Sequence, residues 1–167
     1  MLPKEIAMSP LLKAVFWFVA ANALAGAASL LLFPNQTETL FFWPIRPPIS
    51  AGLFGALYLC GAVAVSHATL RGRWETARYL IPVLVSAGIL LTLTTFIHLD
   101  RFTPGFRLFY WLLIYIGAPL LAIYFYWQHE KASATWEVLG EPVTPATRAV
   151  AMGLGIFLIL FGVVTMI

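Results

Sequence analysis

The sequence is short of charged residues and of cysteine. Charged side chains make up 10% of the 167 residues, against about 25% in an ordinary soluble domain. The single cysteine, Cys60, excludes a disulfide within the chain, and no cysteine–histidine spacing is typical of a zinc or iron–sulfur site. We expect Cys60 to be a small buried apolar residue. No helix or loop carries a dense basic stripe, so the net charge of +3 does not indicate a nucleic-acid partner.

Apolar residues make up 61% of the chain and gather in five runs. Each run is close to the ~20 residues that a helix, rising ~1.5 Å per residue, needs to cross ~30 Å of hydrocarbon. The sequence therefore predicts an all-α, polytopic membrane protein: a helical bundle that forms a single transmembrane domain over residues 1–167. The predicted crossings are residues 11–33, 49–70, 79–99, 107–128 and 149–167.

Basic residues predict which side of the membrane each segment faces. Seven of the ten Lys and Arg lie at the N-terminal end and in segments 71–78 and 129–148, and three lie in segments 34–48 and 100–107. Because cytoplasmic segments carry the excess of Lys and Arg, we expect a cytoplasmic N-terminus, in a bacterial inner membrane. The first 30 residues resemble a signal peptide, but their long charged region favours a retained first helix.

Prolines mark where the helices are expected to stop or bend. Four prolines between residues 34 and 48 break the chain between the first two crossings. The same segment holds Phe41, Phe42 and Trp43, which predicts a short amphipathic element on the outer membrane surface. Pro119 lies within the fourth crossing, where it leaves the carbonyl of Tyr115 without a helical donor and predicts a kink.

The last run, residues 149–167, resembles the first in texture but has no Trp, Tyr, Lys or Arg near its end to anchor it. Two interpretations stay open. Either the bilayer edge coincides with the chain end, or the sequence is the front part of a longer chain with a related second half.

Small residues recur at four-residue spacing on the first two crossings, a pattern that lets helices approach closely in lipid. It predicts either contact with a partner subunit or packing within the protein's own bundle. The expected packing positions are Ala21, Asn22, Ala25, Gly26, Ala51 and Gly55, with Ser29, Cys60, Ala64 and Ala68 continuing the same faces.

Two histidines are candidate ligands for a haem or a chlorophyll-type pigment. His67 precedes the inner turn and His98 precedes the outer one, so they are expected about 30 Å apart and cannot both hold one haem. Either alone could hold a pigment. The alternative is that both are interfacial imidazoles hydrogen-bonded to loop carbonyls or lipid headgroups.

Two short polar segments carry most of the remaining charge. The inner segment is expected to contact lipid headgroups or a partner through Arg71, Arg73, Trp74 and Arg78, with Arg71 also within reach of Glu75. At the outer surface Asp100 is expected to pair with an arginine, because an unpaired carboxylate near hydrocarbon is costly. That predicted ion-pair cluster consists of Asp100, Arg101, Arg46 and Arg107.

None of the five runs has Asp, Glu, Lys or Arg in its middle third. Ion transport and most intramembrane catalysis need such groups or a broken helix, so the sequence favours a protein that is not an enzyme. At Phe-Trp-Pro (42–44), Arg-Gly-Arg-Trp (71–74) and His-Leu-Asp-Arg-Phe (98–102) the chain resembles a group of uncharacterised bacterial multi-pass membrane proteins. That resemblance covers roughly residues 33–128 and implies no activity.

The sequence thus supports three functional hypotheses. The first is an accessory or scaffolding subunit, without a cofactor, that packs against other transmembrane subunits of a larger assembly in the lipid bilayer, with an energy-transducing complex as one candidate. The second is a pigment- or haem-binding protein that uses His98 or His67. The third is a carrier of a small molecule or lipid, with its cavity at Pro119.

Overall fold

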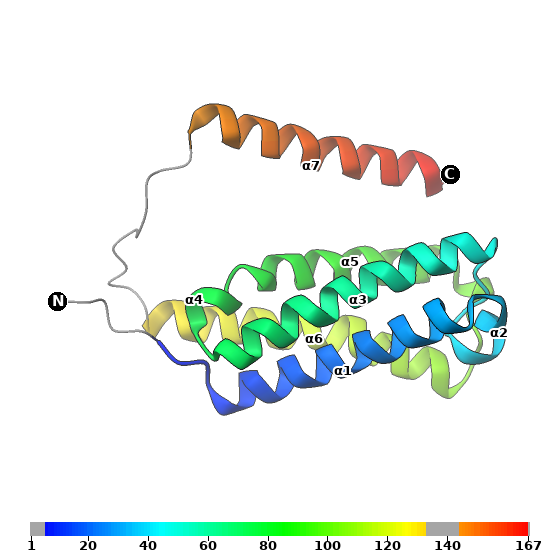
Figure 1. Cartoon of the computed structure of the whole chain (residues 1–167), viewed down its shortest axis with the longest axis horizontal. Helices are drawn as coiled ribbons and strands as arrows, with labels where there is room; N and C mark the ends of the chain where they lie inside the picture. The colour runs from blue at the N-terminus through cyan, green and yellow to red at the C-terminus, as the bar shows by residue number, and fades with distance from the viewer. Residues whose placement is uncertain (1–5, 133–143, 167) are drawn as a thin grey trace. The chain divides into compact units, whose positions relative to one another are not determined.

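The computed structural model describes residues 6–132 and 144–166, with residues 132 and 157–166 described by their backbone alone. The described elements are helical, apart from an isolated antiparallel bridge between Ala7 and Arg73, so the predicted all-α class is confirmed. In chain order (Figure 1) they are α1 (Pro10–Leu32), η1 (Pro34–Gln36), α2 (Thr37–Leu40), α3 (Pro48–Arg71), α4 (Trp74–Ala77), α5 (Leu80–Ile97), η2 (Leu99–Arg101), α6 (Phe106–Ala132) and α7 (Pro145–Met166).

Within the described residues, four helical spans are long and apolar enough to cross a membrane. Each coincides with one of the first four predicted crossings to within a few residues. They are Pro10–Leu32, Pro48–Arg71, Trp74–Ile97 and Phe106–Lys131. The fifth predicted crossing falls on α7, a helix of 22 residues, and its passage through a membrane stays a prediction.

Contacts divide the chain into Met1–Ala134 and Thr135–Ile167, and each unit is described by itself. In the first unit α1 packs along α3, and α5 packs along α6 (Figure 1). Helix α1 also contacts α6, which joins the α1–α3 pair to the α5–α6 pair.

Gly55 lets α1 and α3 approach closely. A Cβ at Gly55 would lie 2.8 Å from Cγ of Leu31 and 3.0 Å from Cβ of Leu30, so only glycine fits without a shift. Ala51 is buried on the same side of α3. On the first helix Gly26 faces the ring of Tyr58, whose Cδ1 would lie 3.2 Å from an added Cβ.

The predicted packing face of α1 needs a correction. Ala21 and Ala25 are exposed, whereas Ala20 and Ala27 are buried. The buried face also contains Phe16, and burying a large aromatic side chain releases more free energy than burying alanine. Because one residue turns a helix by about 100°, the true face lies beside the predicted one.

On α3 the same small-residue pattern holds only in part. Ala68 is buried and Ala64 is half-buried, but Cys60 is exposed. The expectation of a buried Cys60 is therefore wrong, because its side chain lies on the outer surface of the α1–α3 pair.

The α5–α6 pair is closest where Gly88 meets Pro119. A Cβ at Gly88 would lie 2.2 Å from Cγ of Pro119, so the proline ring occupies the space that a side chain would need. The hydroxyl of Thr92 donates a hydrogen bond of 3.2 Å to the carbonyl of Tyr115, the group that Pro119 leaves without a helical donor. Helix α6 continues through Pro119, and the kink at this residue stays a prediction.

The segment between α1 and α3 folds onto one end of the bundle and does not lie simply along the membrane surface. Phe41 and Ile45 are buried in a cluster with Leu30, Phe102 and Trp111. The amide of Ile45 donates to the hydroxyl of Thr37 at 2.9 Å, which closes the turn. The prediction of a surface element here was incomplete, because its apolar side chains cover the bundle core.

Candidate functional site

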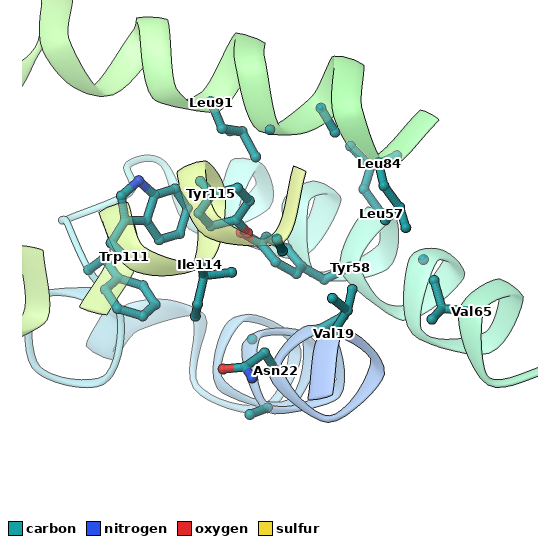
Figure 2. A pocket seen from close by; sticks show the side chains of 18 of the residues that line it. Val19, Asn22, Leu57, Tyr58, Val65, Leu84, Leu91, Trp111, Ile114 and Tyr115 are labelled. Atoms are coloured by element: carbon teal, nitrogen blue, oxygen red, sulfur yellow. The ribbon is translucent and has the colours of Figure 1, made fainter. Parts of the chain in front are cut away.

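A cavity of about 580 Å³ lies between the α1–α3 pair and the α5–α6 pair. Residues of all four long helices line it, together with residues 40–43 (Figure 2). Ligand cavities in proteins usually measure ~300–1,000 Å³, so the space is large enough for a small molecule. Pro119 and Ala118 belong to the wall, as the carrier hypothesis predicted.

The wall is apolar and carries no charge. None of the described residues that line the cavity is Asp, Glu, Lys, Arg or His. Its polar side chains are Asn22, Ser29, three tyrosines and two tryptophans. Such a wall suits an apolar ligand that a few hydrogen bonds hold in place.

Two pairs of polar side chains cross the space between helices. The hydroxyls of Tyr58 on α3 and Tyr115 on α6 are hydrogen-bonded to each other and meet inside the cavity (Figure 2). The hydroxyl of Tyr110 donates to Oδ1 of Asn22 at 2.6 Å, and Nδ2 of Asn22 donates to the carbonyl of Phe18 at 2.9 Å. These bonds tie α6 to both α1 and α3.

Trp111 forms the wall at the end of the cavity near residues 41–43. It is buried, and its indole N–H donates to the hydroxyl of Thr95 at 2.9 Å. Thr95 in turn donates to the carbonyl of Leu91 at 2.6 Å, so the indole is anchored to α5. The rings of Trp111 and Tyr115 lie 4.0 Å apart between centroids, which fixes the tyrosine beside the cavity.

The cavity reaches the surface between α3 and α5, and also beside Ala25 on α1. Leu57 on α3, Ala87 on α5 and Ala25 all line it and are exposed. A Cβ at Gly61, which also lines it, would meet no other atom within 4 Å. In a bilayer these residues lie at the depth of the hydrocarbon, so both openings face lipid.

The two candidate ligand histidines lie outside this cavity. His67 is exposed near the end of α3, where Nε of Arg71 donates to its Nε2 at 3.4 Å. His98 caps the C-terminal end of α5 and is half-buried. Within the described residues no three His, Cys, Asp or Glu side chains are placed to hold a metal ion together.

In the inner segment the predicted contact with lipid headgroups or a partner fails at Trp74, and at Arg71, Arg73 and Arg78 it stays a prediction. Trp74 is 0% exposed and stacks on His129, with centroids 4.7 Å apart, so it cannot contact headgroups or a partner. Arg78 pairs with Glu130 at 3.2 Å. Glu75 pairs with Arg73 at 3.7 Å, and not with Arg71 as predicted, because Arg71 instead binds His67.

Sequence reasoning missed His129, which is buried where the N-terminal segment meets α6. The backbone N–H of Ser9 donates to its Nε2 at 3.4 Å, and its Nδ1 donates to the carbonyl of Phe125 at 2.9 Å. The one local signal is the four-residue spacing from Phe125, because Ser9 is 120 residues away in sequence.

The predicted outer ion-pair cluster is divided. Asp100 pairs with Arg101, its neighbour, at 3.1 Å. Arg46 pairs instead with Glu38 in its own segment. Arg107 donates to the carbonyls of Glu38 and Thr39, at 3.3 and 2.8 Å. Arg107 therefore ties the 34–48 segment to α6, and the three arginines do not share one carboxylate.

No family model matches this chain, and neither a curated protein nor a solved structure matches it.

Proposed function

We propose that this membrane protein binds a small, largely apolar molecule in the cavity between its two helix pairs. The observation that carries the proposal is an uncharged space of about 580 Å³ to which all four long helices contribute. The wall has few polar groups, and apart from Trp43 they come from α1, α3 and α6. The proposed site is the one that the carrier hypothesis expects, because Pro119 lines the cavity.

The size of the cavity argues that something fills it. Empty apolar space is costly in a folded protein because its lining atoms lose contacts. This cavity is open to the surface, so apolar molecules can enter it. A bilayer supplies apolar molecules next to the opening between α3 and α5, and these offset the cost.

The test is to purify the full chain in mild detergent or lipid nanodiscs and identify bound molecules by native mass spectrometry. Ala87→Phe places a ring at the opening, and Ala56→Phe makes the same change at an exposed position that does not line the cavity. We expect a retained apolar molecule in the wild type and in Ala56→Phe, and its loss in Ala87→Phe. Equal retention in both variants, or no retained molecule in the wild type, contradicts the proposal.

The accessory role, the inner-membrane location and the resemblance to uncharacterised multi-pass proteins stay predictions from the sequence. Exposed Ala21 and Cys60 are compatible with a partner helix, since small side chains allow close approach. Purification that retains a second transmembrane subunit in fixed ratio would support the accessory role. The pigment hypothesis also stays a prediction, and it requires a visible absorption band that His98→Ala or His67→Ala removes.

A further inference from the structure

The hydrogen atoms of the polar groups in the cavity indicate what kind of ligand it takes. Tyr58 and Tyr115 have two hydroxyl hydrogens, and their mutual bond uses one. The other has no acceptor among the described residues. The side-chain amide of Asn22 likewise has two hydrogens, of which one goes to the carbonyl of Phe18. The cavity thus offers two donor hydrogens that the described protein does not satisfy.

An unsatisfied hydrogen-bond donor is stronger evidence for a missing partner than an unused lone pair is. A buried hydrogen-bond donor without an acceptor is rare in folded proteins, while an oxygen with one unused lone pair is tolerated. In hydrocarbon there is no bulk water to accept these hydrogens. An acceptor atom of a molecule bound in the cavity would satisfy the tyrosine hydrogen, and the partly exposed Asn22 amide could donate to it as well.

The wall also restricts the charge of that molecule. Asn22 lies midway along α1 (Pro10–Leu32), and Tyr58 lies near the middle of α3, so both face the cavity deep in the membrane. No described lining residue carries a charge that could offset an ionised headgroup. Burying an unpaired ion costs several kcal/mol, which excludes an ionised carboxylate or a phospholipid headgroup as the group that contacts the tyrosines.

Aromatic rings surround the end of the cavity beside Tyr115. Phe41, Phe42, Trp43 and Trp111 line it there, and such rings favour stacking with a flat ring. The opposite side opens between α3 and α5 at Leu57 and Ala87. The site therefore combines a polar, aromatic end with an apolar exit to lipid.

We propose that the ligand is an uncharged, lipid-soluble molecule with carbonyl oxygens on a flat ring and an apolar tail, the chemistry of a quinone. A carbonyl accepts the free hydrogen of the Tyr58–Tyr115 pair, and the tail leaves between α3 and α5. This inference rests on the proposed function, because it names the ligand of the same cavity.

Binding in lipid nanodiscs to three probes with similar tails tests the proposal. They are decylbenzoquinone, decylbenzene, which has no acceptor, and decanoate, which is charged. Affinities are compared as mole fractions in the lipid, which removes differences in partitioning. We expect decylbenzoquinone to bind at least tenfold more tightly than either of the others.

The hydrogen count gives a sharper expectation for variants. Tyr58→Phe or Tyr115→Phe alone leaves one hydroxyl whose hydrogen can turn to the ligand, so quinone affinity should change by no more than about threefold. The double variant removes the last hydroxyl hydrogen and should lose about tenfold, equal to ~1.4 kcal/mol, in the range of one hydrogen bond. Tyr124→Phe, on the exposed side of α6 and outside the cavity, is the control and should bind as the wild type does.

The outcomes separate this inference from the proposed function. If decylbenzene binds as tightly as the quinone, or the double variant keeps wild-type affinity, the carbonyl proposal is wrong while an apolar-ligand site stands. If decanoate binds most tightly, the absence of charge in the wall has been misread and the carbonyl proposal again fails. If none of the three probes binds, both proposals fail. The comparison of probes on the wild type keeps the test decisive even if the double variant does not fold.

Discussion

Gly88→Ala should separate α5 from α6, and it tests the packing on which the cavity depends. The added Cβ would lie 2.2 Å from Cγ of Pro119, about 1.2 Å less than the 3.4 Å at which ordinary contact begins. The proline ring is held in the backbone of α6 and cannot rotate away. The carbonyl of Tyr115, 3.1 Å from the same position, is also backbone, so the two helices must move apart.

The expected cost follows from these distances. Overpacking a close contact costs ~1–3 kcal/mol. Separating the helices also stretches the 3.2 Å bond from Thr92 to the carbonyl of Tyr115, and interhelical bonds in membranes contribute ~0.6 kcal/mol on average. Alanine is a better helix former than glycine by ~1 kcal/mol, which offsets part of the loss. We expect a net decrease of roughly 0.6–2.6 kcal/mol in the free energy of unfolding.

Gly52→Ala is the matched control, because a Cβ at Gly52 in α3 would meet no atom within 4 Å. It should leave the free energy of unfolding unchanged or raise it slightly. The measurement is reversible unfolding in mixed micelles with increasing dodecyl sulfate, followed by far-ultraviolet circular dichroism. If Gly88→Ala is as stable as Gly52→Ala, the α5–α6 contact is not as close as described and the reasoning is refuted.

Three further predictions concern other contacts. Thr92→Val should lower the free energy of unfolding by ~0.6–1.7 kcal/mol, because it leaves the carbonyl of Tyr115 unsatisfied. The control is Thr69→Val, since the hydroxyl of Thr69 donates to a carbonyl within its own helix. In the same unfolding assay this control should lower the free energy of unfolding by less. Trp74→Ala should cost ~3–5 kcal/mol because the side chain is fully buried, and an equal effect of Trp127→Ala, at a position 65% exposed, would contradict this. Reporters inserted near Gln36 should be periplasmic and those near Arg73 cytoplasmic, and the reverse labelling would overturn the orientation derived from basic residues.

The helices were predictable because the membrane constrains them strongly. A spanning segment must satisfy its own backbone and exclude charge, so hydropathy alone locates α1, α3, α5 and α6 to within a few residues. The rotation of each helix about its axis is constrained far less. In lipid both faces of a helix are apolar, so nothing in the pattern of α1 distinguished Ala21 and Ala25 from the buried Ala20 and Ala27.

The same ambiguity explains the error at Trp74. A Trp near the end of a crossing is typical both of an interfacial belt and of a buried ring. Trp74 is fully buried, and its ring partner His129 lies far away in the sequence. Local spacing carries no information about such contacts, so the sequence favoured the interface.

The cavity arises from the contrast between contacts within the helix pairs and contacts between them. Within the pairs, Gly55 and Gly88 remove side chains and bring the backbones close. Between the pairs, Tyr58 on α3 and Tyr115 on α6 meet through their hydroxyls inside the cavity (Figure 2). The two hydroxyls satisfy each other only in part, because their mutual bond uses one of their two hydrogens. The groups that hold the cavity open are thus the groups that leave a donor inside it, which is why a site for a neutral acceptor can exist where no charged residue marks it.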